Sequence, residues 1–203
     1  MDATSVKEKI LKAVREALIE KDDDLFHETE PTPNSEANTD GAVTFAEKII
    51  AKGGAFLFCE KSKDLLQGVI ELFKDNDLSN VYCHDQDLSE VLNACQVNHF
   101  TEITKDHQID YVVAQADALI ADRGSIVLSF DNNAEHVVFA SGATLVVFAT
   151  TNQVVNSYAD VPKLISPHHR NDIPGYIHVI EHPATKNKLE FPRQTYVFLR
   201  YVK

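Results

Sequence analysis

The sequence of 203 residues lacks any run of 18 apolar residues, so it contains no segment long enough to cross a membrane as an apolar helix. Its first residues, MDATSVKEKILKAVREAL, are charged every few positions and lack the hydrophobic core of a secretion signal. We therefore expect a cytoplasmic protein that makes no contact with a membrane.

Basic residues are scarce relative to acidic ones. The chain has 19 Lys and Arg against 31 Asp and Glu, which gives a formal net charge of -12 at pH 7. Proteins that bind nucleic acid or anionic lipid surfaces neutralise phosphates with clustered Lys and Arg. The charge balance therefore argues against both partners and favours solubility.

Cysteine is also rare, and its spacing excludes the common sites built from thiolates. Cys59, Cys83 and Cys95 lie in or beside apolar runs, and no pair has CxxC spacing. The chain therefore has no cysteine cluster to hold a zinc ion or an iron–sulfur centre by itself. We interpret the three residues as small core side chains in a reducing compartment.

The familiar catalytic signatures are absent from the sequence as well. There is no GxSxG elbow, no Walker loop and no GxGxxG after a strand, and the glycines of KGGAF are placed to end a helix. Cys83 and His84 are neighbours on an expected strand, so their side chains should point to opposite faces. A Cys/His nucleophile pair is therefore not expected.

The N-terminal region divides into a helix and a linker. Ser5 and Glu8 form a capping box, and the apolar side chains that follow share one helical face, so residues 1–21 are predicted to be a helix. Residues 22–42 carry acids, prolines and little to bury, which predicts an acidic linker that a protease would cut early. Residues 43–203 then form the main α/β domain.

The first half of that domain alternates between helix and strand. The expected elements are TFAEKIIAKGG (helix), AFLFCE (strand), SKDLLQGVIELFKDND (helix), NVYCH (strand) and DQDLSEVLNACQ (helix). Such alternation predicts a mostly parallel sheet with helices on its faces.

The second half of the domain is richer in short strands. The runs DYVVAQADALIA, SIVLSF, EHVVFAS and ATLVVFA are predicted strands, and a short helix is expected to begin near TNQVVNSY. Strands that follow one another this closely are typical of antiparallel pairs. We expect these pairs to extend the same sheet.

Two charges and a glycine interrupt this apolar region at Asp122, Arg123 and Gly124. One interpretation is a tight turn, for which Asp-x-Gly is an ordinary sequence. The other is an anion site, in which Arg123 and Ser125 hold a carboxylate or phosphate, Gly124 allows close approach, and Asp122 orients the arginine. The sequence leaves both interpretations open.

A histidine-rich segment, SPHHRNDIPGYIHVIEH, contains several types of metal ligand. If YIHVIEH is a strand, His178 and His182 share a face but lie roughly 13 Å apart at ~3.3 Å per residue, too far to bind one ion. Adjacent histidines point apart in an extended chain. We therefore expect no metal from the candidate ligands His168, His169, His178, His182, Asp172 and Glu181.

The runs ADALIADRGSIVLSF and ATLVVFATTNQVV, preceded by ILKAVREAL, resemble the LUD-domain family, whose best known member type is lactate utilisation protein C. Ile120, Ala121, Asp122, Gly124 and Ser125 match the family pattern Ile-Ala-Asp/Glu-Thr-Gly-Ser/Thr, in which Arg123 replaces a small hydroxyl residue. A second family pattern, at the start of a helix, is matched by Gln153, Val154 and Val155.

The resemblance implies a Rossmann-like three-layer α/β sandwich with a mixed, mostly parallel sheet, similar to the glucosamine-phosphate isomerase, ribose-phosphate isomerase and CoA-transferase group. It implies an accessory or regulatory protein of organic-acid (lactate) utilisation that binds a small anionic ligand or an iron–sulfur partner protein of a lactate utilisation operon. The alternative is an enzyme of that fold group, with Asp122 or a nearby carboxylate as acid–base residue. No cofactor is expected, and the oligomeric state, a homo-oligomer included, stays open.

Overall fold

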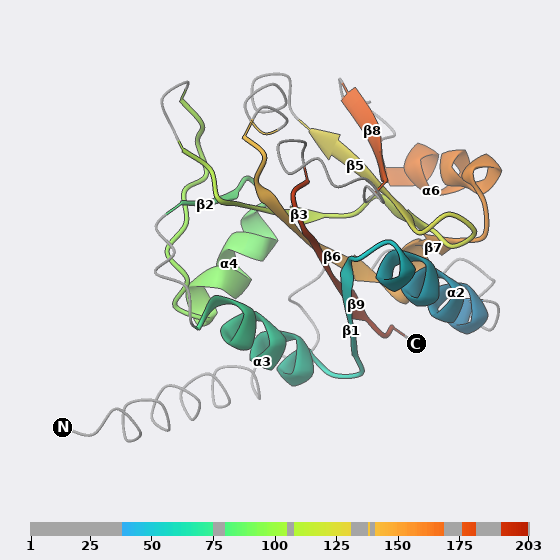
Figure 1. Cartoon of the computed structure of the whole chain (residues 1–203), viewed down its shortest axis with the longest axis horizontal. Coiled ribbons are helices and arrows are strands. Elements are labelled where there is room, and N and C mark those ends of the chain that lie inside the picture. Colours follow the sequence, from blue (N-terminus) through green and yellow to red (C-terminus); the bar gives the residue numbers. More distant parts are fainter. Residues whose placement is uncertain are drawn as a thin grey trace.

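A fully parallel five-stranded sheet lies at the centre of the computed structural model, which describes residues 38–74, 80–104, 108–130, 138, 141–168, 176–181 and 192–202 (Figure 1). Its strands follow the spatial order β1-β9-β6-β3-β2. They are β1 (Ala55–Cys59), β2 (Val81–Cys83), β3 (Tyr111–Gln115), β6 (Thr144–Thr150) and β9 (Thr195–Arg200). The predicted mostly parallel α/β fold is confirmed.

Two helices cover one face of this sheet, as the alternation of helix and strand predicts. They are α3 (Ser62–Phe73) and α4 (Gln86–Ala94), and their apolar faces pack against Val146 and Phe148 of β6. The Asp85 carboxylate accepts the backbone N–H of Leu88 over 2.8 Å and so caps α4. Both helices begin immediately after a parallel strand, which is the arrangement of a βα unit.

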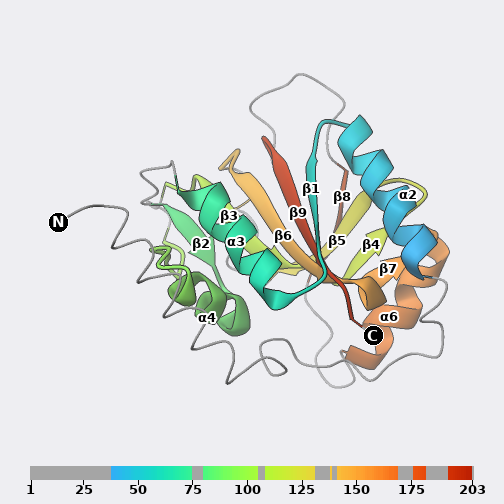
Figure 2. The ribbon, with the colours of Figure 1, turned by 90° about the horizontal axis from the view of Figure 1, so that it is seen from below.

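A second sheet of four strands packs against the other face (Figure 2). Its spatial order is β7-β4-β5-β8, and it consists of β4 (Ala118–Ile120), β5 (Ser125–Phe130), β7 (Val154–Val155) and β8 (Tyr176–Glu181). β5 is antiparallel to both of its neighbours, whereas β7 is parallel to β4. The expectation that the antiparallel pairs extend the parallel sheet is therefore wrong.

The two sheets separate at Ala116 and Asp117, in the middle of the segment DYVVAQADALIA, which the sequence pattern predicts to be one strand run. The N–H of Ala116 donates to Phe148 O over 2.8 Å and so keeps the end of β3 beside β6. The N–H of the next residue, Asp117, donates to Val127 O over 2.9 Å and so joins β4 to β5. The run 111–120 therefore passes from one sheet to the other within two residues.

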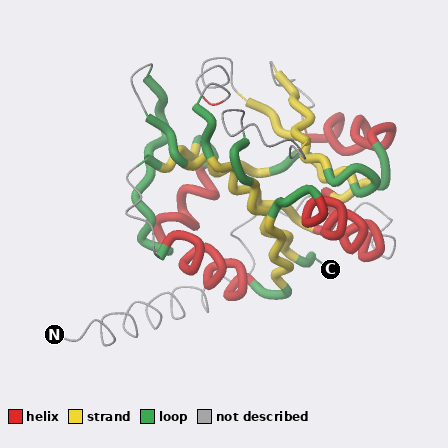
Figure 3. The backbone as a smooth tube through the Cα atoms, viewed as in Figure 1, coloured by secondary structure: helices red, strands yellow, loops and turns green. Residues whose placement is uncertain are grey.

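Helix α2 (Asn38–Ala51) shares the layer of the second sheet, and α6 (Val161–His168) covers the outer face of that sheet (Figure 3). Helices α3 and α4, the parallel sheet, and the second sheet with α2 form the layers of the Rossmann-like sandwich. α2 begins at Asn38, so the last five residues of the expected linker 22–42 are helical. The predicted helix 1–21 and residues 22–37 lie outside the described residues.

The helix expected near TNQVVNSY begins later than the sequence indicates. Thr151–Gln153 form a 3-10 turn, and Val154–Val155 form strand β7 beside β4. A second 3-10 turn, Tyr158–Asp160, leads into α6. The N–H of Ala121 donates to Val155 O over 2.8 Å and so joins β7 to the end of β4. A helix would direct this carbonyl along its own axis, so the pairing with β4 requires the extended conformation. The expected strand EHVVFAS is wrong where it can be checked, because Val138 is helical and Ser141 lies in a turn. Its other residues lie outside the described part of the chain.

Within the described part of the chain, no helix combines the length and the apolar character that crossing a membrane requires.

Candidate functional site

The turn Ala121–Gly124 connects β4 to β5 and carries the predicted site residues. The N–H of Gly124 donates to Ile120 O over 2.8 Å, and Gly124 has a φ of 60°. The N–H groups of Ala121 and Asp122 donate to the carbonyls of Val155 and Asn156, over 2.8 and 3.1 Å. The turn is therefore fixed both internally and to the segment that follows β6.

Gly124 also allows the turn to lie directly against α2. A Cβ atom at Gly124 would be 2.7 Å from Lys48 Cβ and 2.9 Å from the backbone nitrogen of Ile49. Any larger side chain would displace backbone, and the positive φ disfavours it independently. The tight turn is therefore a sufficient explanation for a glycine at this position.

Arg123 and Ser125 converge on one carboxylate oxygen, Glu181 Oε1 at the end of β8. Ser125 Oγ donates to this oxygen over 3.2 Å, and Arg123 Nη1 lies 3.9 Å from it. Ser125 is fully buried, whereas the side chains of Arg123 and Glu181 are 64% and 52% exposed. An ion pair this exposed contributes little to stability. The arrangement nevertheless shows two donors placed around a carboxylate.

Glu181 is the member of this cluster that sequence reasoning missed as an anion-site residue. It reaches Ser125 because β5 and β8 are antiparallel with these two residues in register, although 56 residues separate them along the chain. Asp122, the expected partner of Arg123, has an exposed side chain, and the carboxylate that Arg123 approaches is that of Glu181. Only the position of Glu181 at the end of an alternating strand pattern hints at its role.

Gln153, which belongs to the second family-like pattern, joins the two sheets. Its Oε1 accepts the N–H and the hydroxyl of Thr150 over 2.7 and 3.2 Å, and its Nε2 donates to Ala116 O. Ala116 directly follows β3, and Thr150 ends β6. The side chain therefore holds the carboxyl ends of two central strands and the start of the second sheet at fixed spacing, which makes Gln153 a structural brace.

The histidine segment can be followed only in part. His178 lies on β8 three residues before Glu181, so the two side chains point to opposite faces of the strand. His169, Asp172 and His182 and the side chain of His168 lie outside what is described. Among the described residues, no group of three or more His, Cys, Asp and Glu side chains is arranged to hold a metal ion.

The cysteines are free and occupy apolar surroundings, as the sequence predicts. Burial raises the pKa of Cys59 and Cys95 to about 12 each and the pKa of Cys83 to about 11. For Cys59 the nearby Asp64 carboxylate raises the pKa further. Cys83 is fully buried at the end of β2, whereas the adjacent His84 is exposed. The protonated thiols are poor nucleophiles at neutral pH.

Comparison with known proteins is informative at the level of the fold. No family model matches the sequence, and no curated protein matches it. The crystal structure of a DUF162 family protein from Deinococcus radiodurans is similar, with a TM-score of 0.60 and 12% sequence identity over 80% of this chain and 98% of that chain. DUF162 is the LUD-domain-like family. The fold expected from the LUD resemblance is therefore the one observed.

Proposed function

We propose that this chain is a LUD-type accessory or regulatory protein of organic-acid utilisation, lactate being the expected acid, that binds a small anion at the β4–β5 turn. The observation that supports the proposal is the convergence of Arg123 Nη1 and Ser125 Oγ on one carboxylate oxygen. The family and the metabolic role rest on the sequence resemblance, and the observed fold is the one that this family implies. An iron–sulfur protein that presents a carboxylate is the corresponding macromolecular partner.

In the proposed bound state, the carboxylate of the ligand takes the place of the Glu181 carboxylate. Arg123 is suited to this exchange because its guanidinium is mostly exposed and its contact with Glu181 is long, at 3.9 Å. Ser125 is held in β5 and supplies a second, fixed donor. The Glu181 side chain is half exposed at the end of β8, so it can turn toward water when the ligand enters.

The test is a binding screen with lactate, pyruvate, sugar phosphates and acyl-CoA, by thermal shift and then by calorimetry. Arg123→Ala should weaken binding of the hit roughly tenfold or more, because a charge-assisted contact is worth about 1.5–3 kcal/mol and ~1.4 kcal/mol corresponds to one decade. Glu181→Gln should strengthen binding, because it removes a competing negative charge from the site.

Lys163→Ala is the matched control. Lys163 pairs with Asp160 at the start of α6 and is 76% exposed, so its removal deletes a similar surface cation outside the site. Binding by this variant should equal that of the wild type. Equal affinity of Arg123→Ala and wild type for the hit, or no binding of any of the four ligand classes, would contradict the proposal.

A further inference from the structure

The described sheets end in four edge strands, and β1 is the longest of them without a histidine or a charged residue. β2 has three residues, and Phe100 covers it with the hydrogen bonds Phe100 N to Val81 O and Cys83 N to Phe100 O, 2.9 and 3.0 Å long. β7 has two residues. β8 has six residues and exposes Ile177 and Val179, but it carries His178 and ends on the charged Glu181. β1 has five residues, AFLFC, with no charge and no proline. Natural edge strands are usually protected by shortness, cover, charge or proline.

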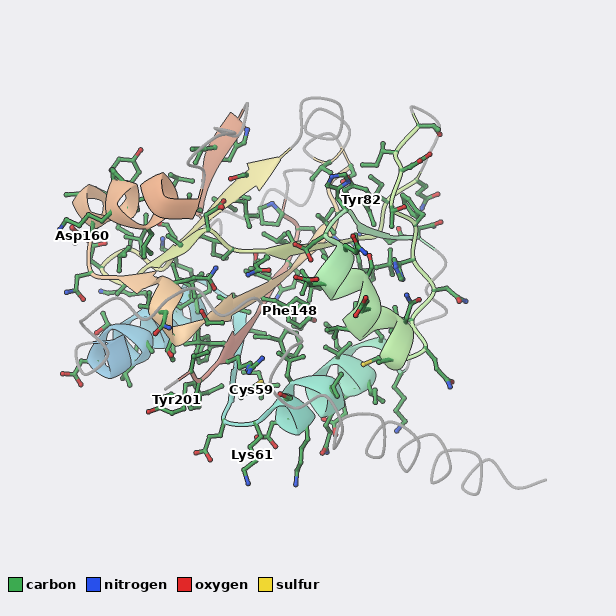
Figure 4. All side chains as sticks on the ribbon, turned by 180° about the vertical axis from the view of Figure 1, so that it is seen from behind. Cys59, Lys61, Tyr82, Phe148, Asp160 and Tyr201 are labelled. Atoms are coloured by element: carbon green, nitrogen blue, oxygen red, sulfur yellow. The ribbon has the colours of Figure 1, made fainter. Side chains whose placement is uncertain are left out.

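Exposed apolar side chains gather on and beside this strand. Leu57 and Phe58 of β1 are 40% and 41% exposed, and Tyr201 directly after β9 is 40% exposed. The rings of Phe58 and Tyr201 lie 6.3 Å apart, and Tyr201 N donates to Cys59 O over 2.9 Å, so Tyr201 extends the same surface (Figure 4). A long apolar edge of this kind is a template for pairing with another strand.

Helix α2 borders this edge on one side. Phe45 of α2 packs against Phe56 of β1 with their ring centroids 6.1 Å apart, and Figures 1 and 2 show α2 beside β1. Val43 and Ile50, seven residues apart on α2, are 56% and 55% exposed. Residues seven apart lie on the same face of a helix, so α2 adds an apolar stripe to the surface around β1.

We propose that β1 pairs antiparallel with β1 of a second copy of this chain, so that two five-stranded sheets become one continuous sheet across a twofold axis at Leu57. A twofold interface requires a self-complementary surface. The strand meets this requirement, because the pairing places Leu57 opposite Leu57, Phe56 opposite Phe58, and Ala55 opposite Cys59. Every position in the ladder then has an apolar partner.

The charges that flank β1 also favour pairing with a second copy of the chain. Lys52 lies in the turn before the strand and Glu60 directly follows it. Antiparallel pairing at Leu57 places Glu60 of each copy opposite Gly54 of the other copy, beside the turn that ends α2 and carries Lys52. An acid of one copy therefore meets a basic turn of the other copy at each end of the paired strands. Attraction between these opposite charges favours the twofold arrangement.

The first test measures the molar mass of the full chain by size-exclusion chromatography with light scattering. We expect the mass of a dimer for the wild type and of a monomer for Leu57→Lys, which places two like charges at the axis. Tyr158→Lys is the control, because Tyr158 is 59% exposed on a 3-10 turn away from β1 and should leave the dimer intact. A monomeric wild type, which a different strand partner would also give, would overturn the proposal.

The second test remains valid if Leu57→Lys does not fold. Residues directly opposite in an antiparallel pair have Cα atoms about 4.5–5.5 Å apart, which is within the range that a disulfide spans. Oxidised Leu57→Cys should therefore migrate as a covalent dimer that a reductant converts to monomer, whereas Tyr158→Cys should not. Failure of Leu57→Cys to cross-link would show that the twofold axis does not pass through this strand.

Discussion

Gly124 lies so close to Lys48 that a Cβ atom on the glycine would be 2.7 Å from the Cβ of the lysine. The contact joins the β4–β5 turn to α2, and the φ of 60° at Gly124 adds a second reason for glycine. Packing against α2 therefore fixes the position of the turn that carries Arg123. Its geometry is set by packing, whether or not an anion binds to its outer side.

Gly124→Val should therefore destabilise the protein even without a ligand. A β-branched residue at positive φ costs about 1–3 kcal/mol, and displacement of the α2 backbone adds to that. At roughly 2–4 °C per kcal/mol for a chain of this size, the melting temperature should fall by several degrees. The neighbouring Arg123→Ala should leave the melting temperature nearly unchanged, because the side chain is 64% exposed. Equal melting of Gly124→Val and wild type would show that the turn and α2 separate easily.

Replacement of Gln153 by Leu should loosen the junction between the sheets. It removes the acceptor for Thr150 N and the donor to Ala116 O, and each buried group left unpaired costs about 1–3 kcal/mol. Urea unfolding should therefore show a lower midpoint. Hydrogen exchange should accelerate first at the amides around residues 116 and 150.

Gln67→Leu is the control for this experiment. Gln67 is exposed on α3 and makes a side-chain hydrogen bond of 3.0 Å to Glu71 on the same helix. Its replacement should change the unfolding midpoint by much less. An equally small change for Gln153→Leu would mean that the junction does not depend on this side chain.

The three free thiols, two of them buried and that of Cys95 partly buried, predict a loss of stability at alkaline pH. Their folded-state pKa values of about 12, 11 and 12 lie above the ordinary value of 9.0, so the folded protein keeps protons that the unfolded chain releases. This contribution is complete below about pH 9 and is lost as the pH rises from about 9 toward 12. The free energy of unfolding, measured in urea at pH 8, 9 and 10, should decrease over this range.

Cys83→Ala isolates the effect of one thiol. The variant should be less stable than the wild type at pH 8 because it leaves a small cavity in the core between the sheet and helices α3 and α4. The difference between the two proteins should shrink toward pH 10, because the thiol no longer favours the folded wild type there. A difference that is independent of pH would contradict the raised pKa of Cys83.

Local sequence patterns are enough to predict the type of most described elements and the turn at Gly124. Amphipathic spacing places α3 and α4, apolar runs place β1, β2 and β6, and Asp-x-Gly places the turn at Gly124. These signals are local, because the period of the apolar residues and the conformational freedom of glycine act over a few neighbouring residues.

The pairing of the strands, in contrast, cannot be predicted from local patterns. β9 is the last strand in the chain but inserts between β1 and β6, and the run 111–120 divides between two sheets at Ala116. Glu181 meets Ser125 only because β8 pairs with β5 in one register. An apolar strand pattern predicts which side chains face the core. It does not specify the neighbouring strand, because any strand with a similar pattern could pair there. The packing of the whole chain therefore selects the pairing, and with it the carboxylate beside Arg123.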